Sequence, residues 1–101
     1  MAPLRSYVSG AWHTPLDEGA PINDAVTGEE VARVSSAGID FAAALGHGRR
    51  SGAGLRELTF HQRAALLKTL ASYLREHREE LYALSYRTGA TLGDSKVDID
   101  G

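Results

Sequence analysis

The stretch from Thr59 to Gly89 constrains the fold more than any other part of the chain, because no proline or glycine interrupts it before its last residue. Thr59 and Gln62 have the spacing of a capping box, in which each side chain accepts a hydrogen bond from a free backbone N–H group at a helix start. Apolar residues then recur at helical spacing and form one stripe. The stripe consists of Phe60, Ala64, Leu67, Leu70, Ala71 and Leu74.

This pattern predicts a helix over residues 59–76, a break near His77, and a second helix closed by Gly89 at its C′ position. The predicted buried face of the first helix is Leu67, Leu70, Ala71 and Leu74. A stripe of this width needs a surface that covers it. Beyond Gly89, either Asp94 or Ser95 is expected to cap one more helix.

Four short extended segments precede the helical part, and turn residues join them into two hairpins. The segments are Leu4–Val8, Ala11–His13, Ile22–Ala25 and Glu30–Val34. Ser9-Gly10 is a two-residue turn signal in the first hairpin, and Gly28 suits a positive φ in the second. We therefore predict β-hairpins over residues 1–35 and helices over residues 36–101.

Between the hairpins and the long helical stretch, the sequence predicts a short helix and then a connector. The helix begins at Ile39, with Ser36 or Gly38 as its cap, and ends near Gly46. The glycines that follow are Gly48, Gly52 and Gly54. Their spacing does not match a phosphate-binding loop, and they follow a helix rather than a strand, so we interpret the segment as a flexible connector.

Composition excludes several classes of protein. The net charge is −2, and the nine basic residues of 41–101 face seven acidic ones, which is too small an excess for a nucleic-acid surface. The absence of cysteine excludes a disulfide framework, a thiolate metal site and a cysteine nucleophile among these residues. No apolar run approaches the roughly 20 residues of a membrane span, and the start of the chain lacks a signal-peptide pattern. We expect a cytoplasmic protein that binds neither nucleic acid nor membrane.

The residues alone form no complete acid–base pair, no nucleophile with its base and no metal cluster. Arg49 and Arg50 could contact an anionic ligand, but a solvated pair is the more common role of such residues. Trp12 is expected to anchor the first hairpin by covering apolar area. We therefore predict that the chain contains no catalytic and no cofactor-binding residue.

Three motifs in this order resemble the aldehyde dehydrogenase superfamily. Tyr7–Trp12 is similar to the opening hairpin of the family, which ends in Gly-x-Trp, and Asp24–Glu29 is similar to its Asn-Pro-x-Thr-Gly-Glu turn. Thr59–Gly89 resembles its first long helix pair. Asp24 and Ala25 depart from the Asn-Pro of the wider family, which alters the hydrogen bonding of that turn.

A narrower likeness concerns residues 34–40, 58–63 and 88–101. They resemble the subgroup that oxidises CoA-linked semialdehydes after ring opening, including the bifunctional aldehyde dehydrogenases of phenylacetate degradation. The resemblance implies an α/β parent protein with a Rossmann-like domain that binds NADP. In such enzymes a thiolate attacks the aldehyde, a hydride passes to the nicotinamide, and water releases the acid.

Because members of this family run to several hundred residues, the resemblance implies that the chain is an N-terminal fragment. Residues 1–101 would then form the N-terminal part of one cofactor-binding domain, with the remainder of that domain as their partner, and the parent would be a homo-oligomer. The chain alone is expected to bind no cofactor and to have no dehydrogenase activity.

The resemblance also implies a structural site for a monovalent cation. The matching positions are Asn23, through its backbone carbonyl, and Asp100, through its carboxylate. Hard cations prefer oxygen ligands of this kind. The simpler interpretation of Asp100 is a carboxylate at the start of a helix, where the helix dipole favours negative charge.

An alternative of a different class also fits the residues. The chain could be a self-contained helical module that binds a protein partner through the apolar stripe of residues 59–89.

Overall fold

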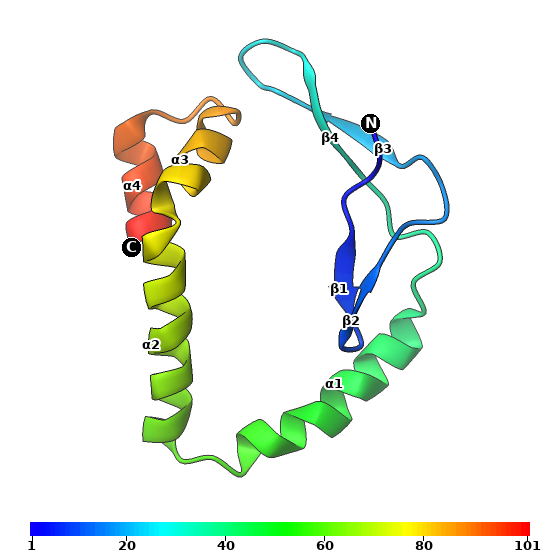
Figure 1. The fold of residues 1–101 in the computed structure, drawn as a ribbon, viewed down its shortest axis with the longest axis vertical. Helices are drawn as coiled ribbons and strands as arrows, with labels where there is room; N and C mark the ends of the chain where they lie inside the picture. Colours follow the sequence, from blue (N-terminus) through cyan, green and yellow to red (C-terminus); the bar gives the residue numbers. More distant parts are fainter. The chain divides into compact units, whose positions relative to one another are not determined.

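A computed structural model describes residues 1–101, which form four strands followed by four helices (Figure 1). The strands are β1 (Ser6–Val8), β2 (Ala11–His13), β3 (Ala20–Asn23) and β4 (Glu30–Val34). The helices are α1 (Phe41–Arg56), α2 (Phe60–Glu76), α3 (Arg78–Tyr86) and α4 (Leu92–Asp100). This order confirms the prediction of two short hairpins followed by three to four helices.

The residues divide into two compact units. The first contains Met1–Asn23 and Glu29–Glu57, and the second contains Asp24–Gly28 and Leu58–Gly101. The second unit is therefore built from two separate pieces of sequence, a short turn and the C-terminal helices.

The first hairpin forms as the turn signal predicts. Ser9 and Gly10 both have positive φ, 52° and 78°, as a two-residue hairpin turn of type I′ requires. Tyr7 and Trp12 face each other across β1 and β2, with their rings edge to face and their centroids 5.2 Å apart. The guanidinium of Arg5 lies 5.0 Å from the centre of the Trp12 ring. Trp12 therefore supports this hairpin through local aromatic contacts.

The second hairpin pairs β3 with β4 in antiparallel register, from Ala20 opposite Val34 to Asn23 opposite Glu30. A register irregularity lies between Ile22 and Asn23. The strand ends at Asn23, so the next two residues belong to the turn and not to the predicted extended segment. Such an irregularity bends a strand and ends its pairing, which explains the early boundary.

The glycine-rich segment is helical, which contradicts the predicted connector. α1 contains Gly46, Gly48, Gly52 and Gly54 within one continuous helix (Figure 1, green). Its N-cap is Asp40, whose carboxylate accepts a hydrogen bond from the Ala43 N–H at 3.0 Å, so neither Ser36 nor Gly38 is the cap. A glycine costs about 1 kcal/mol relative to alanine in a helix, which weakens the helix without forbidding it.

α2 and α3 follow the sequence prediction closely. The Gln62 N–H donates to the Thr59 hydroxyl oxygen at 3.2 Å, and the Thr59 N–H donates to Gln62 Oε1 at 2.8 Å, which completes the capping box. His77 ends α2 and begins α3, so the break lies where expected. Gly89 has a φ of +88°, but α3 ends at Tyr86, which puts Gly89 one residue beyond the predicted C′ position.

The predicted buried face of α2 is exposed, so this prediction is wrong for the chain as it stands. The exposed fractions are 66% for Leu67, 54% for Leu70 and 42% for Leu74, and Ala71 is exposed as well. Within the second unit, α3 and α4 contact each other, and α4 approaches this face only at its C-terminal end, where Ile99, Asp100 and Gly101 line a hollow together with Ala71 and Leu74. Helical periodicity identifies which side chains share a face, but it does not supply the surface that buries them.

The best-buried side chains of the second unit lie where α3 meets α4. Tyr82 is 3% exposed and Ser95 is fully buried. The cap of α4 is Thr91, and not Asp94 or Ser95 as predicted: the Asp94 N–H donates to the Thr91 hydroxyl at 3.2 Å. Thr91 and Asp94 have the three-residue spacing of a capping box, and this local arrangement determines where the helix begins.

Candidate functional site

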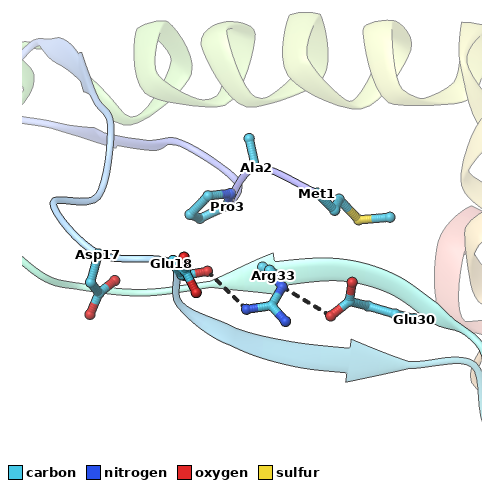
Figure 2. A pocket seen from close by; sticks show the side chains of 7 residues that line it. All are labelled: Met1, Ala2, Pro3, Asp17, Glu18, Glu30 and Arg33. Atoms are coloured by element: carbon cyan, nitrogen blue, oxygen red, sulfur yellow. Dashed lines mark hydrogen bonds and ion pairs between the residues drawn. The ribbon is translucent and has the colours of Figure 1, made fainter.

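The first unit has a hollow of about 390 Å³ beside the start of the chain (Figure 2). Its lining residues are Met1, Ala2, Pro3, Asp17, Glu18, Glu30 and Arg33. Arg33 Nε forms an ion pair with Glu30 Oε1 at 3.0 Å. Arg33 Nη1 also donates to the backbone carbonyls of Glu18, at 3.3 Å, and Gly19, at 3.2 Å. The one guanidinium of the hollow is therefore already bound to the protein.

The remaining side chains of this hollow offer little chemistry. Asp17 Oδ1 accepts a hydrogen bond from the Gly19 N–H at 3.1 Å, which closes the loop before β3 locally. The lining contains no histidine, serine or lysine that could act as a nucleophile or a neutral base. We interpret the hollow as a structural feature in which Arg33 ties the loop to β4.

The second unit has a polar contact between α3 and α4. The Tyr82 hydroxyl donates to Asp100 Oδ1 at 2.5 Å. Ser95 Oγ lies 2.8 Å from both Ser85 Oγ and the Thr91 carbonyl oxygen. The hydrogen bond to Asp100, together with burial and nearby negative charge, raises the pKa of Tyr82 to about 12. The raised pKa keeps the phenol protonated, and so a hydrogen-bond donor, well into the alkaline range.

Asp24 organises the turn between β3 and β4. Its Oδ1 accepts hydrogen bonds from the N–H groups of Val26, at 2.7 Å, and Thr27, at 3.0 Å. The bonds from Thr27 and Val26 hold the pKa of the Asp24 carboxyl below its usual 3.8, and the positive charge of Arg87 adds a smaller effect. The turn also meets the end of α3, because the Ala25 N–H donates to the Arg87 carbonyl at 2.8 Å.

The two predicted cation ligands belong to different units. Asn23 is the last residue of β3 in the first unit, and Asp100 is the last residue of α4 in the second. One carboxylate oxygen of Asp100 already accepts the Tyr82 hydroxyl. No group of three or more histidine, cysteine, aspartate or glutamate side chains is arranged to hold a metal ion.

Comparison with known proteins shows where these two units belong. A family model described as "Aldehyde dehydrogenase family" matches residues 12–101. The chain belongs to the aldehyde dehydrogenase family. The 3,4-dehydroadipyl-CoA semialdehyde dehydrogenase of Aromatoleum evansii is 47% identical over 97% of this chain. The chain spans 19% of the length of that relative, so the similarity covers about a fifth of it.

The match to the aldehyde dehydrogenase family confirms the resemblance inferred from the hairpins, the turn and the long helix pair. None of the four helices combines the length and the apolar character needed to cross a lipid bilayer. The functional assignment thus rests on the family and the relative, because neither the hollow nor the α3–α4 contact forms a catalytic arrangement.

Sequence reasoning missed the polar contacts of the second unit in this member of the aldehyde dehydrogenase family. Tyr82 and Asp100 lie on separate helices, and no spacing rule predicts that they meet. The pairing of Ala25 with Arg87 had a partial signal, because an alanine in place of the family's proline supplies an N–H that needs a partner. The cap of α4 could have been predicted from the sequence, since Thr91 and Asp94 have the spacing of a capping box.

Proposed function

We propose that this chain is the N-terminal part of an NADP-dependent aldehyde dehydrogenase that oxidises a CoA-linked semialdehyde to the acid during the degradation of phenylacetate and related aromatic compounds. The observation that carries the proposal is the 47% identity to the semialdehyde dehydrogenase of A. evansii over 97% of this chain. The family match supports the reaction class, and the named relative supports the substrate class.

In this proposal, residues 1–101 form the first part of one cofactor-binding domain and contribute structure. They contain no cysteine to act as the nucleophile. Their glycine-rich segment lies inside α1, where the backbone N–H groups bond within the helix and are not free to bind phosphate. These residues do not fit an NADP site, so we assign the cofactor and the reacting groups to the remainder of the domain, the main partner of this chain.

The same proposal includes a cytoplasmic, homo-oligomeric enzyme and a structural site for Na⁺ or K⁺. The backbone carbonyl of Asn23 and the carboxylate of Asp100 are the proposed ligands, with further oxygens from the rest of the domain. The Tyr82 hydroxyl restrains one oxygen of Asp100 and leaves the other available, which suits a hard cation.

The cation site can be tested by comparing Asp100→Ala with Asp98→Ala in the full polypeptide. Asp98 lies on the same helix and serves as the matched control. Na⁺ and K⁺ should each raise the Tm of the wild type and of Asp98→Ala, relative to choline at equal ionic strength, and should leave Asp100→Ala unchanged. Equal responses of the wild type and Asp100→Ala would rule out Asp100 as a ligand.

The enzymatic proposal is tested with the purified full polypeptide and a pair of substrates, an aldehyde attached to CoA and the same aldehyde without CoA. Reduction of NADP, followed as the increase in absorbance at 340 nm, should be much faster with the CoA-linked aldehyde than with the free aldehyde. The rate with the CoA-linked aldehyde should fall when NAD replaces NADP. The absence of turnover with any CoA-linked semialdehyde would overturn the substrate class. Equal rates with the two nucleotides would overturn the cofactor preference alone.

The exposed apolar face of α2 favours the second candidate, a helical interaction module. The two candidates differ in what the 101-residue chain does alone. A segment of a larger domain should self-associate or lose fixed side-chain order, whereas a complete module should be monomeric and unfold cooperatively. Sedimentation and near-UV circular dichroism of residues 1–101 distinguish these results.

A further inference from the structure

The turn Asp24–Gly28 lies against the end of α3, although the two are far apart in the sequence. The direct attachment is the hydrogen bond from the Ala25 N–H to the Arg87 carbonyl, 2.8 Å long. The Ala25 Cβ is also 4.0 Å from the point where a Cβ on Gly89 would stand. The backbone of the turn and the backbone that follows α3 are therefore in close contact.

The turn is already closed within itself before it meets the helix. The N–H groups of Val26 and Thr27 are bonded to the Asp24 carboxylate, and the Gly28 N–H donates to the Asp24 carbonyl at 2.9 Å. The Ala25 N–H takes no part in these internal bonds and donates instead to the end of α3. A preorganised donor loses little conformational freedom when it binds.

The end of α3 supplies the matching acceptor. The N–H groups that follow the helix are bonded to carbonyls of its last turn: Arg87 to Leu84 at 3.1 Å, Thr88 to Ser85 at 3.0 Å, and Gly89 to Tyr86 at 3.0 Å. Carbonyls at a helix end have no partner within the helix, and the Ala25 N–H supplies one for Arg87. The Arg87 side chain adds attraction to the Asp24 carboxylate.

We propose that the turn Asp24–Gly28 is a conformational strap that holds the connection between α3 and α4, residues 87–91, in place. The Ala25 N–H is its attachment point. When the hydrogen bond between Ala25 and Arg87 breaks, residues 87–91 open locally, whereas α2 stays folded. The connection borders a hollow of about 440 Å³ that is lined by Thr88, Gly89, Ala90, Asp94, Val97 and Asp98. Detachment therefore changes the shape of this hollow.

Amide hydrogen exchange of the full polypeptide tests the strap. Ala25→Pro removes the N–H, and an ester in place of the Ala25 amide removes the same hydrogen without introducing a proline ring. Ala25→Gly keeps the N–H and is the matched control. Both variants that lack the N–H should speed the exchange of the Arg87, Thr88 and Gly89 amides about fivefold, as expected for the loss of one net hydrogen bond. Amides of α2 should keep their wild-type rates.

Two results would overturn the proposal. One is faster exchange confined to the amides of residues 24–28, because the hydrogen bond would then stabilise the turn alone and not residues 87–91. The other is equal acceleration at residues 87–89 in Ala25→Gly, because the effect would then come from chain flexibility and not from the hydrogen bond. The ester variant keeps the test decisive if Ala25→Pro does not fold.

Discussion

The Tyr82 hydroxyl donates a 2.5 Å hydrogen bond to the carboxylate of Asp100 and joins the middle of α3 to the last residue of α4. Because Tyr82 is only 3% exposed, its hydroxyl has little access to water and depends on this partner. The bond also makes the contact sensitive to alkaline pH.

The first prediction concerns this alkaline range. The pKa of Tyr82 is raised from 10.0 to about 12, so the bond contributes its full stability below pH 10 and loses it as the pH rises towards 12. Tyrosinate absorbance that the wild type has and Tyr82→Phe lacks should appear near pH 12. At pH 8, Tyr82→Phe should lower the Tm more than Tyr86→Phe, a matched removal of one hydroxyl from α3. A Tyr82 signal already complete at pH 10 would contradict the assignment.

The second prediction concerns acid. The folded state lowers the pKa of Asp24 below 3.8, so its contribution to stability is complete above 3.8 and is lost as the pH falls through the lowered value. Asp24→Asn keeps an oxygen acceptor for the turn and removes the titration. The Tm of the wild type should therefore fall more steeply than that of Asp24→Asn below pH 4. Asp98→Asn, a control on α4, should follow the wild type.

The third prediction uses the glycines of α1. A Cβ on Gly48 or Gly54 would meet no atom within 4 Å, so alanine fits at both positions. Each substitution should raise the free energy of unfolding by about 0.5–1 kcal/mol, measured with urea, because alanine is the better helix former. Gly28→Ala is the opposite control: its φ of +77° disfavours any side chain, so it should destabilise the protein. No gain at either α1 position would argue against a continuous helix.

The fourth prediction separates the chain from the full polypeptide. Leu70 is 54% exposed, so Leu70→Ala should leave the helical far-UV circular dichroism of residues 1–101 unchanged. In the full polypeptide, where we propose that further parts of the domain cover α2, the same substitution should lower the free energy of unfolding by about 2–5 kcal/mol. Lys68→Ala, a polar control on α2, should have a small effect in both. A small cost of Leu70→Ala in the full polypeptide would contradict burial of the stripe.

Features fixed by neighbouring residues were predictable from the sequence. The turn at Ser9 and Gly10 and the capping box of Thr59 with Gln62 depend on local conformational preference and short-range hydrogen bonds. The same reasoning failed for α1, because single-residue propensities gave four glycines more weight than the Asp40 cap.

Features that depend on distant contacts were not predictable. The period of α2 identified which leucines share a face, but not whether this chain covers them, and Leu67 remains 66% exposed. The burial of Ser95 and the Tyr82–Asp100 bond require the crossing of α3 and α4, which leaves no periodic trace in the sequence. The predicted ligands Asn23 and Asp100 belong to separate units, and their role remains a proposal.

The hydrogen bond between Ala25 and Arg87 also has a consequence for the order of folding events. Forming this bond closes a long loop. The chain must lose the conformational entropy of that loop before the single hydrogen bond can stabilise the closed form. The helices on the C-terminal side form through local contacts and should precede it. We therefore expect protection of the Ala25 amide to develop last in pulsed hydrogen exchange, so that a chain emerging from the ribosome acquires the turn between β3 and β4 in final form only after residue 87 has been made.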